Sequence, residues 1–274
     1  MSIEKFAVIG HPIEHSKSPV IHQAFASQFG KSMSYEKILS PLDGFSETVN
    51  RLRTEGYLGV NITVPFKFEA FEASHALSER ATAAGAVNTL SFKGQQIIGD
   101  NTDGCGLVND ILKHWQRTVS GQKILLLGAG GAAQGVMLPL LAQKPALLTV
   151  ANRSLDKAQA MARRFEAGAQ SHQVKLAVQT FADLAENYDI VINATSAGLQ
   201  AEALPVNDAI FSQHTLAYDM MYGRETPFMQ QARAAKAQVA DGLGMLVEQA
   251  AEAFYIWHGL RPDTSPVIQS FRQS

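Results

Sequence analysis

The chain has 274 residues, of which 46% are hydrophobic and 18% charged, and its formal net charge is -2. This composition excludes an intrinsically disordered chain, and the small net charge gives no general attraction to nucleic acid. No apolar stretch approaches the roughly 20 residues that cross a bilayer, and "MSIEKFAVIG" lacks the basic and apolar regions of a signal peptide.

Apolar runs alternate with helical patterns along the chain, which indicates an α/β protein. The helix expected at 18–30 has Ser18 as its N-cap, Pro19 in its first turn and Gly30 just past its end. The first elements in chain order are a strand at 6–10, that helix, a strand at 33–39, a helix at 43–56, a strand at 58–64, short helices within 65–83 and a hairpin at 86–99.

A second region follows a helix that begins near Asp103. Its strands are apolar without alternation, as expected for parallel strands that are covered on both faces. The elements expected there are a strand and helix at 123–143, a strand and helix at 147–165, strands at 175–180, 189–195, 215–222 and 238–242, and a helix at 243–259. We place the domain boundaries at 1–102, 103–240 and 241–274, the last segment packing back on the first domain.

The strongest local signal is "LLLGAGGAAQG", in which a strand runs through a glycine turn into a helix. Gly128 permits the tight turn, Gly130 lets backbone approach a pyrophosphate, and Ala133 allows close helix–strand contact. The helix N-terminus offers N–H groups to phosphates. We interpret the stretch as a dinucleotide site rather than a plain strand-to-helix turn. Its loop residues are Gly128, Ala129, Gly130, Gly131, Ala132 and Ala133.

The end of the next strand indicates which dinucleotide fits. An NAD site has an acidic residue about 20 residues after the glycines, but Asn152, Arg153 and Ser154 stand there instead. Arg153 can pair with a 2′-phosphate, and Lys157 adds positive charge one turn later. Arg153 or Lys157 considered alone would be interpreted as a solvated surface charge. Following this glycine loop, they favour NADP over NAD.

Two charged residues are candidates for chemistry. "GVNITVPFK" is a strand that stops at a proline and then presents Lys67, either as a solvated charge or toward a partner. "GDNTDGCG" places Asp103 at a helix start, where an N-cap role is the alternative. Cys105 has no suitably spaced histidine, so we expect no nucleophile there. As the single cysteine, it rules out an internal disulfide and permits a reducing compartment.

The stretch "HPIEHSKS" contains two further patterns. His11 and His15 match a zinc motif that requires a helix, but Pro12 follows a strand and leaves no room for one, so we expect no metal. Ser16 and Ser18 place two hydroxyls on a loop, which suits a carboxylate or polyol. A capping role alone for Ser18 remains equally open.

Nine stretches together resemble the shikimate dehydrogenase family, nearly end to end and in the family's order: "HSKSP", "GVNITVPFK", "GAVNT", "GDNTDG", "GAGGAA", "NRS", "NATSAG", "YDMMY" and "DGLGMLVEQAA". That family reduces 3-dehydroshikimate to shikimate with NADPH, a step of aromatic amino acid (chorismate) biosynthesis. The resemblance implies that Lys67 and Asp103 face each other across the substrate as the catalytic pair. A nascent alkoxide needs a proton or positive charge, which a lysine can supply.

The resemblance also implies binding roles. Ser16 and Ser18 would bind the substrate carboxylate, and Thr195, Met220 and Gly242 would touch the cofactor near its ribose and nicotinamide. Members often carry arginine where this chain has Lys157, and lysine cannot make a planar two-point clamp. The remaining pocket residues implied are Asn61, Thr63, Asn88, Tyr222 and Gln249.

We therefore predict a two-domain α/β enzyme, with an N-terminal substrate domain, a Rossmann-type doubly wound parallel sheet and the active site in the cleft between them. NADP is the expected cofactor, with a small-molecule substrate, no metal, no nucleic acid or membrane partner, a cytoplasmic location, and a monomeric or homodimeric state. A quinate/shikimate dehydrogenase using NAD would carry an acidic residue near Arg153. A dehydrogenase of a folate derivative would lack "SKS" and "NTDG", and a nucleotide-sensing regulator would not retain Lys67 and Asp103.

Overall fold

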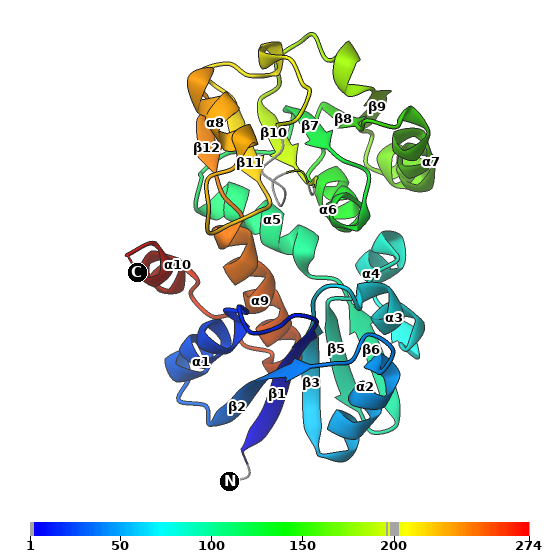
Figure 1. The fold of residues 1–274 in the computed structure, drawn as a ribbon, viewed down its shortest axis with the longest axis vertical. Coiled ribbons are helices and arrows are strands. Elements are labelled where there is room, and N and C mark those ends of the chain that lie inside the picture. Colours follow the sequence, from blue (N-terminus) through cyan, green and yellow to red (C-terminus); the bar gives the residue numbers. More distant parts are fainter. Residues whose placement is uncertain (1–2, 196, 198–202, 274) are drawn as a thin grey trace. The chain divides into compact units, whose positions relative to one another are not determined.

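The computed structural model describes residues 3–195, 197 and 203–273. The chain forms two compact units: unit 1 comprises Met1–Gly106 and Val247–Ser274, and unit 2 comprises Leu107–Leu246 (Figure 1). The borders fall inside two helices, α5 (Asp103–Lys113) and α9 (Leu243–His258), because each helix continues from one unit into the other. Within the described ranges, no helix combines the length and apolar character needed to cross a membrane.

Unit 1 contains a six-stranded mixed sheet. β1 pairs in parallel with β2 and β3, and β3, β5 and β6 continue the sheet in antiparallel order. The strands in sheet order are β2 (Met33–Leu39), β1 (Glu4–Gly10), β3 (Tyr57–Ile62), β5 (Thr89–Lys93), β6 (Gln96–Asp100) and β4 (Ala76–Leu77). The helices are α1 (Ser18–Gln28), α2 (Phe45–Thr54), α3 (Lys67–Glu72), α4 (Glu79–Ala84), most of α9, and α10 (Ser265–Gln273).

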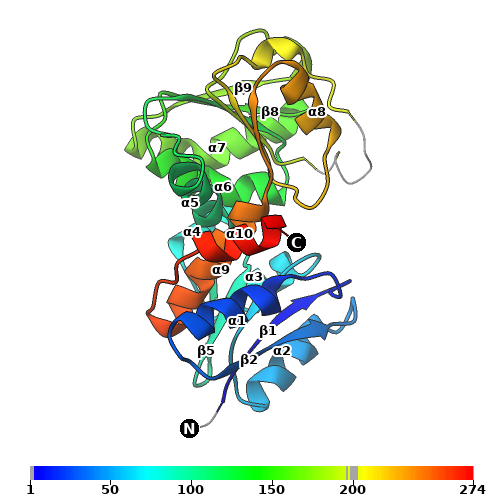
Figure 2. The same ribbon diagram turned by 90° about the vertical axis from the view of Figure 1, so that its left-hand side faces the viewer.

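The side-chain alternation of β1 supplies both faces of this sheet. Ala7 and Ile9 belong to a core cluster with residues of α2, whose buried Phe45, Val49 and Leu52 recur at helical spacing. Phe6 points to the other face, where its ring stacks on Trp257 of α9 at 4.7 Å. Helix α9 lies beside α1 in both views (Figures 1 and 2). The C-terminal segment is therefore part of the core of unit 1.

His22 of α1 is buried among aromatic rings on this second face. Its side chain is 0% exposed, its ring stacks on Tyr35 at 4.3 Å, and neither ring nitrogen has a hydrogen-bond partner among the described residues. Burial, with a smaller effect of His258, lowers the pKa of His22 from 6.5 to about 3. The folded protein therefore holds His22 neutral at pH values where an exposed histidine is charged.

We expect this histidine to make the folded state less stable in mild acid. Between pH 6.5 and 3 the unfolded chain binds a proton that the folded chain does not, so stability is complete above pH 6.5 and falls as the pH is lowered. At pH 5 the loss is about 2 kcal/mol. Urea unfolding at pH 7 and pH 5 should show a smaller difference for His22→Phe than for the wild type. The exposed His15→Gln control should keep the wild-type difference, and an unchanged difference in His22→Phe would contradict this reasoning.

Unit 2 contains a six-stranded sheet in which every pairing is parallel. In sheet order the strands are β12 (Gln238–Ala240), β11 (Leu216–Asp219), β10 (Ile190–Asn193), β7 (Lys123–Leu127), β8 (Leu147–Ala151) and β9 (Lys175–Gln179). The helices are α6 (Gly131–Ala142), α7 (Leu155–Ser171) and α8 (Pro227–Ala234), with 3₁₀ turns at Phe181–Asp183 and Asp208–Ile210. The strand order reverses between β7 and β10, which is where doubly wound sheets bind ligands.

The predicted α/β class is confirmed, and most predicted strands and helices are present within a few residues. Strand β4 and helix α10 were not predicted. The prediction that Ser18 is an N-cap is wrong, because Lys17 occupies that position and Ser18 is the first helical residue. The Ser18 N–H is instead accepted by Ser16 Oγ at 3.3 Å, so the hydroxyl that caps this turn lies two residues earlier.

Candidate functional site

Lys67 and Asp103 form an ion pair within unit 1. Lys67 begins α3 directly after the turn that follows β3, and Asp103 begins α5. Lys67 Nζ lies 2.6 Å from Asp103 Oδ2, and the two side chains are 30% and 15% exposed. The pair is therefore held in place by a strong, charge-assisted hydrogen bond while both groups stay reachable from solvent.

Asn88, which directly precedes β5, binds the carboxylate of this pair. Its amide Nδ2 donates to Asp103 Oδ1 at 2.8 Å and to Thr102 Oγ1 at 2.9 Å, and its Oδ1 accepts from the Thr102 N–H at 2.9 Å. Asn88 is 2% exposed. Both carboxylate oxygens of Asp103 thus have a donor, Lys67 on one and Asn88 on the other, which fixes the orientation of the carboxylate.

Gln249 of α9 reaches the same cluster from the far end of the sequence. Its Oε1 accepts from Asn88 Nδ2 and from Thr102 Oγ1, each at 3.3 Å. The structure therefore brings together four residues predicted from the sequence: Lys67, Asn88, Asp103 and Gln249. Thr102 joins them without having been predicted, because a threonine next to a site aspartate carries no signal of its own.

Asn61 is more enclosed than its predicted role suggests. It is 6% exposed, and both amide hydrogens donate inside the protein, to Asn88 O at 3.2 Å and Thr89 Oγ1 at 3.1 Å. Its Oδ1 accepts from the Tyr35 hydroxyl at 2.7 Å. Thr63, two residues later, is half-buried just beyond β3 and is held by a backbone bond to Ile9 at 2.9 Å.

A second buried charge cluster lies beside these residues in unit 1. Arg80 makes a two-point contact with Asp100 at 2.6 and 3.0 Å, and its Nη1 contacts Glu252 of α9 at 3.1 Å. Arg261 also binds Glu252, at 2.7 Å. Arg80 further donates to Cys105 Sγ at 2.8 Å, and burial raises the pKa of that thiol. The raised pKa disfavours the thiolate, as expected for a cysteine that is not a nucleophile.

The glycine loop of unit 2 lies between β7 and α6. Gly128 has a φ of +108°, which favours glycine, and an added Cβ would lie 3.2 Å from Ala194 O. Gly130 is the N-cap of α6 and provides no side-chain cap, and an added Cβ there would meet nothing within 4 Å. Ala133 is fully buried. The absence of a side chain at Gly130 is therefore not required by internal packing, and it leaves the helix N-terminus open to a phosphate group.

The residues predicted to read the 2′-phosphate lie at the end of β8. Arg153 and Lys157 are exposed, and among the described residues neither has a salt-bridge partner. Asn152 Nδ2 donates to Ser154 O at 3.0 Å, and Ser154 is the N-cap of α7. The carboxylate that comes next along the chain, Asp156, lies in the first turn of α7. Two uncommitted cations at this position fit an additional phosphate.

The carboxyl ends of β10 and β11 are joined by a buried network that the sequence did not suggest. Asp219 accepts from Asn193 at 3.1 Å and from the Thr226 hydroxyl at 2.5 Å. Asn193 in turn accepts from the Thr195 hydroxyl at 2.7 Å. Burial raises the pKa of Asp219, an effect that these hydrogen bonds oppose. The network holds Thr195, one of the predicted cofactor residues, at the edge of the sheet near the glycine loop.

Met220 and Gly242 lie against each other at the same edge of unit 2. An added Cβ on Gly242 would stand 2.3 Å from Met220 O, so only glycine permits this backbone approach. Tyr222 follows in the loop after β11, half-buried, and burial raises the pKa of its hydroxyl. Tyr222 belongs to unit 2, whereas the other six predicted substrate residues belong to unit 1.

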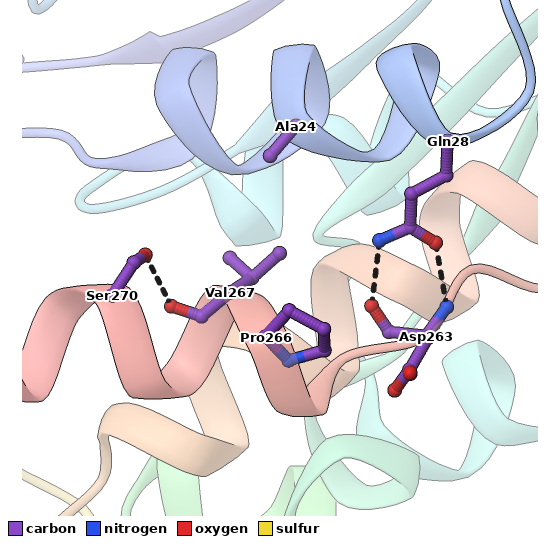
Figure 3. A pocket seen from close by; sticks show the side chains of 6 residues that line it. All are labelled: Ala24, Gln28, Asp263, Pro266, Val267 and Ser270. Carbon is purple, nitrogen blue, oxygen red and sulfur yellow. Dashed lines mark hydrogen bonds between the residues drawn. The ribbon is translucent and has the colours of Figure 1, made fainter.

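A hollow of about 580 Å³ elsewhere in unit 1 contains none of the predicted site residues. Figure 3 shows it between α1 and α10, where the amide of Gln28 exchanges two 2.8 Å hydrogen bonds with the backbone of Asp263. Its lining residues are Ala24, Gln28, Asp263, Pro266, Val267 and Ser270.

Three family models match the chain in sequence. They are the shikimate dehydrogenase substrate binding domain over residues 8–90, shikimate / quinate 5-dehydrogenase over 110–210, and the shikimate 5′-dehydrogenase C-terminal domain over 242–270. A Methylobacillus flagellatus protein named shikimate dehydrogenase (NADP(+)) is 57% identical over 98% of this chain and 99% of its own. The chain belongs to the shikimate dehydrogenase family.

Solved structures similar to this chain have the same fold. A shikimate 5-dehydrogenase from Thermus thermophilus, crystallised with NADP(H) and shikimate, has a TM-score of 0.86 and 32% identity, covering 99% of each chain. An Ael1 enzyme from Pseudomonas putida has a TM-score of 0.92 and 43% identity, covering 97% of each. The predicted two-domain fold with a Rossmann-type unit is therefore confirmed.

Proposed function

We propose that this chain catalyses the reversible reduction of 3-dehydroshikimate to shikimate with NADPH, in aromatic amino acid biosynthesis. The observation that carries the proposal is the 2.6 Å Lys67–Asp103 pair, surrounded by the hydrogen-bonding side chains of Asn88 and Gln249. A partly exposed ammonium beside amides suits a substrate with a carbonyl and several hydroxyls. The relatives named as NADP-dependent shikimate dehydrogenases support the same substrate and cofactor.

Lys67 and Asp103 have different roles in the proposed reaction. When bound, NADPH supplies the hydride that the carbonyl carbon receives. The ammonium of Lys67 stabilises the negative charge that develops on the carbonyl oxygen, and it carries a proton which that oxygen can take to become the hydroxyl. Asp103 holds the ammonium in position through the 2.6 Å contact. Solvent can restore the proton because the Lys67 side chain is 30% exposed.

Unit 1 provides most of the substrate contacts in this proposal. Ser16 and Ser18 bind the carboxylate, and Thr63, Asn88 and Gln249 contact the ring hydroxyls. Tyr222, a residue of unit 2, is the remaining substrate contact that we propose. Asn61 acts from behind them, because its amide hydrogens already donate to other residues of the protein. An analogue that lacks one hydroxyl would leave a polar partner unpaired, which explains how such a site selects its substrate.

Unit 2 provides the cofactor contacts. The open helix N-terminus at Gly130 receives the pyrophosphate, and Arg153 with Lys157 receives the 2′-phosphate. The remaining contacts proposed for NADP are Gly128, Ala129, Gly131, Ala132, Ala133, Asn152, Ser154, Thr195, Met220 and Gly242. We place the enzyme in the cytoplasm, where its single cysteine stays a free thiol, as a monomer or homodimer.

Initial rates with shikimate or quinate, each with NADP or NAD, test this function. We expect fast turnover only with shikimate and NADP. In the same assay Arg153→Ser should raise the KM for NADP about tenfold or more, because a charged hydrogen bond to the phosphate is lost, and should leave the KM for NAD unchanged. A preference for quinate or NAD in the wild type would overturn the substrate or cofactor assignment. An equal change of both KM values in Arg153→Ser would show that Arg153 does not read the phosphate.

A further inference from the structure

Four hydrogen bonds connect a buried tyrosine to the carboxylate of the catalytic pair. The Tyr35 hydroxyl donates to Asn61 Oδ1 at 2.7 Å, and Asn61 Nδ2 donates to Thr89 Oγ1 at 3.1 Å. Thr89 Oγ1 donates to Asn88 Oδ1 at 2.9 Å, and Asn88 Nδ2 donates to Asp103 Oδ1 at 2.8 Å. Every bond of this chain has its acceptor on the side of Asp103, so each polarises the next in the same sense.

The sheet register of unit 1 places these residues in line. Tyr35 of β2 is level with Phe6 of β1, and Asn61 of β3 is level with Val8, two residues along the same face of β1. Asn61 is in turn paired with Thr89 of β5 across the antiparallel ladder. Strand pairing therefore places Tyr35, Asn61 and Thr89 on one face of the sheet. Asn88, which directly precedes β5, continues the chain of bonds to Asp103.

The four residues that lead from Tyr35 to Asn88 are shielded from solvent. The exposures of Tyr35, Asn61, Thr89 and Asn88 are 9%, 6%, 0% and 2%. The Tyr35 ring is held between the sheet and His22, on which it stacks at 4.3 Å. Burial raises the pKa of Tyr35 well above its usual value, so its hydroxyl stays a donor at any physiological pH. Water cannot replace a lost link, and each bond is stronger than it would be in solvent.

We propose that Tyr35 is a positioning residue for catalysis, acting through Asn61, Thr89 and Asn88 to hold the carboxylate of Asp103 against Lys67. The inference rests on the proposed function, because it needs Asp103 to take part in turnover. Tyr35 itself touches neither member of the ion pair. Its effect is to fix the Asn61 amide, and through it the hydroxyl and amide that finally donate to Asp103.

The decisive variant is Tyr35→Phe, which removes the first donor and keeps the ring stacked on His22. We expect kcat to fall about tenfold, with the KM values for shikimate and NADP within twofold of the wild type. Tyr57→Phe is the matched control, a buried tyrosine of the same sheet outside the chain of bonds, and should keep the wild-type kcat. The Tyr35 hydroxyl also interacts with the Ser18 side chain. A rise in the KM for shikimate at unchanged kcat would overturn the proposal, because Tyr35 would then act through Ser18.

A double-mutant cycle with Thr89→Val separates transmission along the chain from two independent packing effects. If Tyr35→Phe already interrupts the chain of bonds, adding Thr89→Val should lower kcat by less than a further twofold relative to the more impaired single variant. Multiplicative losses, or wild-type kcat in Tyr35→Phe, would overturn the proposal. Should Tyr35→Phe fail to fold, Thr89→Val alone must show the same loss of kcat at unchanged KM. Asp103→Asn tests the proposed function separately. Full turnover in this variant would show that Asp103 is not part of a catalytic pair, whatever the result for Tyr35→Phe.

Discussion

Replacing Lys67 with alanine should lower kcat about 10²- to 10⁴-fold, the range typical of a positioned proton donor. The variant removes the ammonium that contacts Asp103, so negative charge developing on the substrate oxygen would lose the group that stabilises it. The affinity for NADPH should not change, because the proposed cofactor contacts lie in unit 2. Initial rates together with NADPH titration, followed by nucleotide fluorescence, measure the two quantities on one preparation.

Lys93→Ala provides the matched control for this experiment. Lys93 is an exposed lysine of the same unit, at the hairpin between β5 and β6, and its loss should leave both kcat and NADPH affinity at wild-type values. A Lys67→Ala enzyme with kcat within threefold of the wild type would refute the catalytic role. Equal losses of kcat and of NADPH binding would instead indicate a general structural defect.

Replacing Arg80 with methionine should destabilise the fold by about 3–5 kcal/mol, the usual result of removing one partner from a buried ion pair. Asp100 and Glu252 are 16% and 11% exposed. In the variant, Asp100 would lose its two-point contact with the guanidinium, and Glu252 would lose one of the two arginines that bind it. Methionine fills a similar volume, so the loss would come from the uncompensated carboxylates. Urea unfolding at pH 7, followed by circular dichroism, measures the change.

Arg51→Met is the comparison for this result, because Arg51 pairs with Glu55 on the exposed face of α2, where the two side chains are 53% and 44% exposed. An exposed pair of this spacing contributes only about 0.3–0.5 kcal/mol. Arg80→Lys should fall between the two, because lysine keeps the charge and loses the two-point geometry. If Arg80→Met cost no more than Arg51→Met, burial would not determine the strength of this cluster.

The elements with strong periodic signals were predictable from the sequence, and the others were not. The parallel strands of unit 2 were visible as apolar runs because both of their faces are covered. Strand β4 has only two residues, Ala76 and Leu77, and pairs with β6, so its existence depends on a neighbour rather than on its own pattern. Ser18 carried a genuine capping signal, yet the neighbouring Ser16 accepts the N–H of Ser18 itself.

In the candidate site, too, some features were predictable from the sequence and others were not. Lys67 and Asp103 are 36 residues apart, and no spacing rule brings them together; their residue types and flanking motifs singled them out, and the fold of unit 1 supplies the 2.6 Å contact. The role of Asn61 could not be inferred, because its amide is occupied by Tyr35 from another strand and by Thr89 across the ladder. From sequence alone, a tyrosine in a strand indicates only a core residue. The partner of its hydroxyl depends on the sheet register, which the sequence does not show.

Unit 1 is built from both ends of the chain, and this has a consequence for synthesis on the ribosome. Unit 2 is continuous, so it can close its core as soon as its last strand emerges, whereas β1 and α1 must wait for Phe254 and Trp257. A nascent chain that stops before residue 247 would carry one finished unit and one with an uncovered aromatic face. That interval is when the polypeptide has most need of a chaperone.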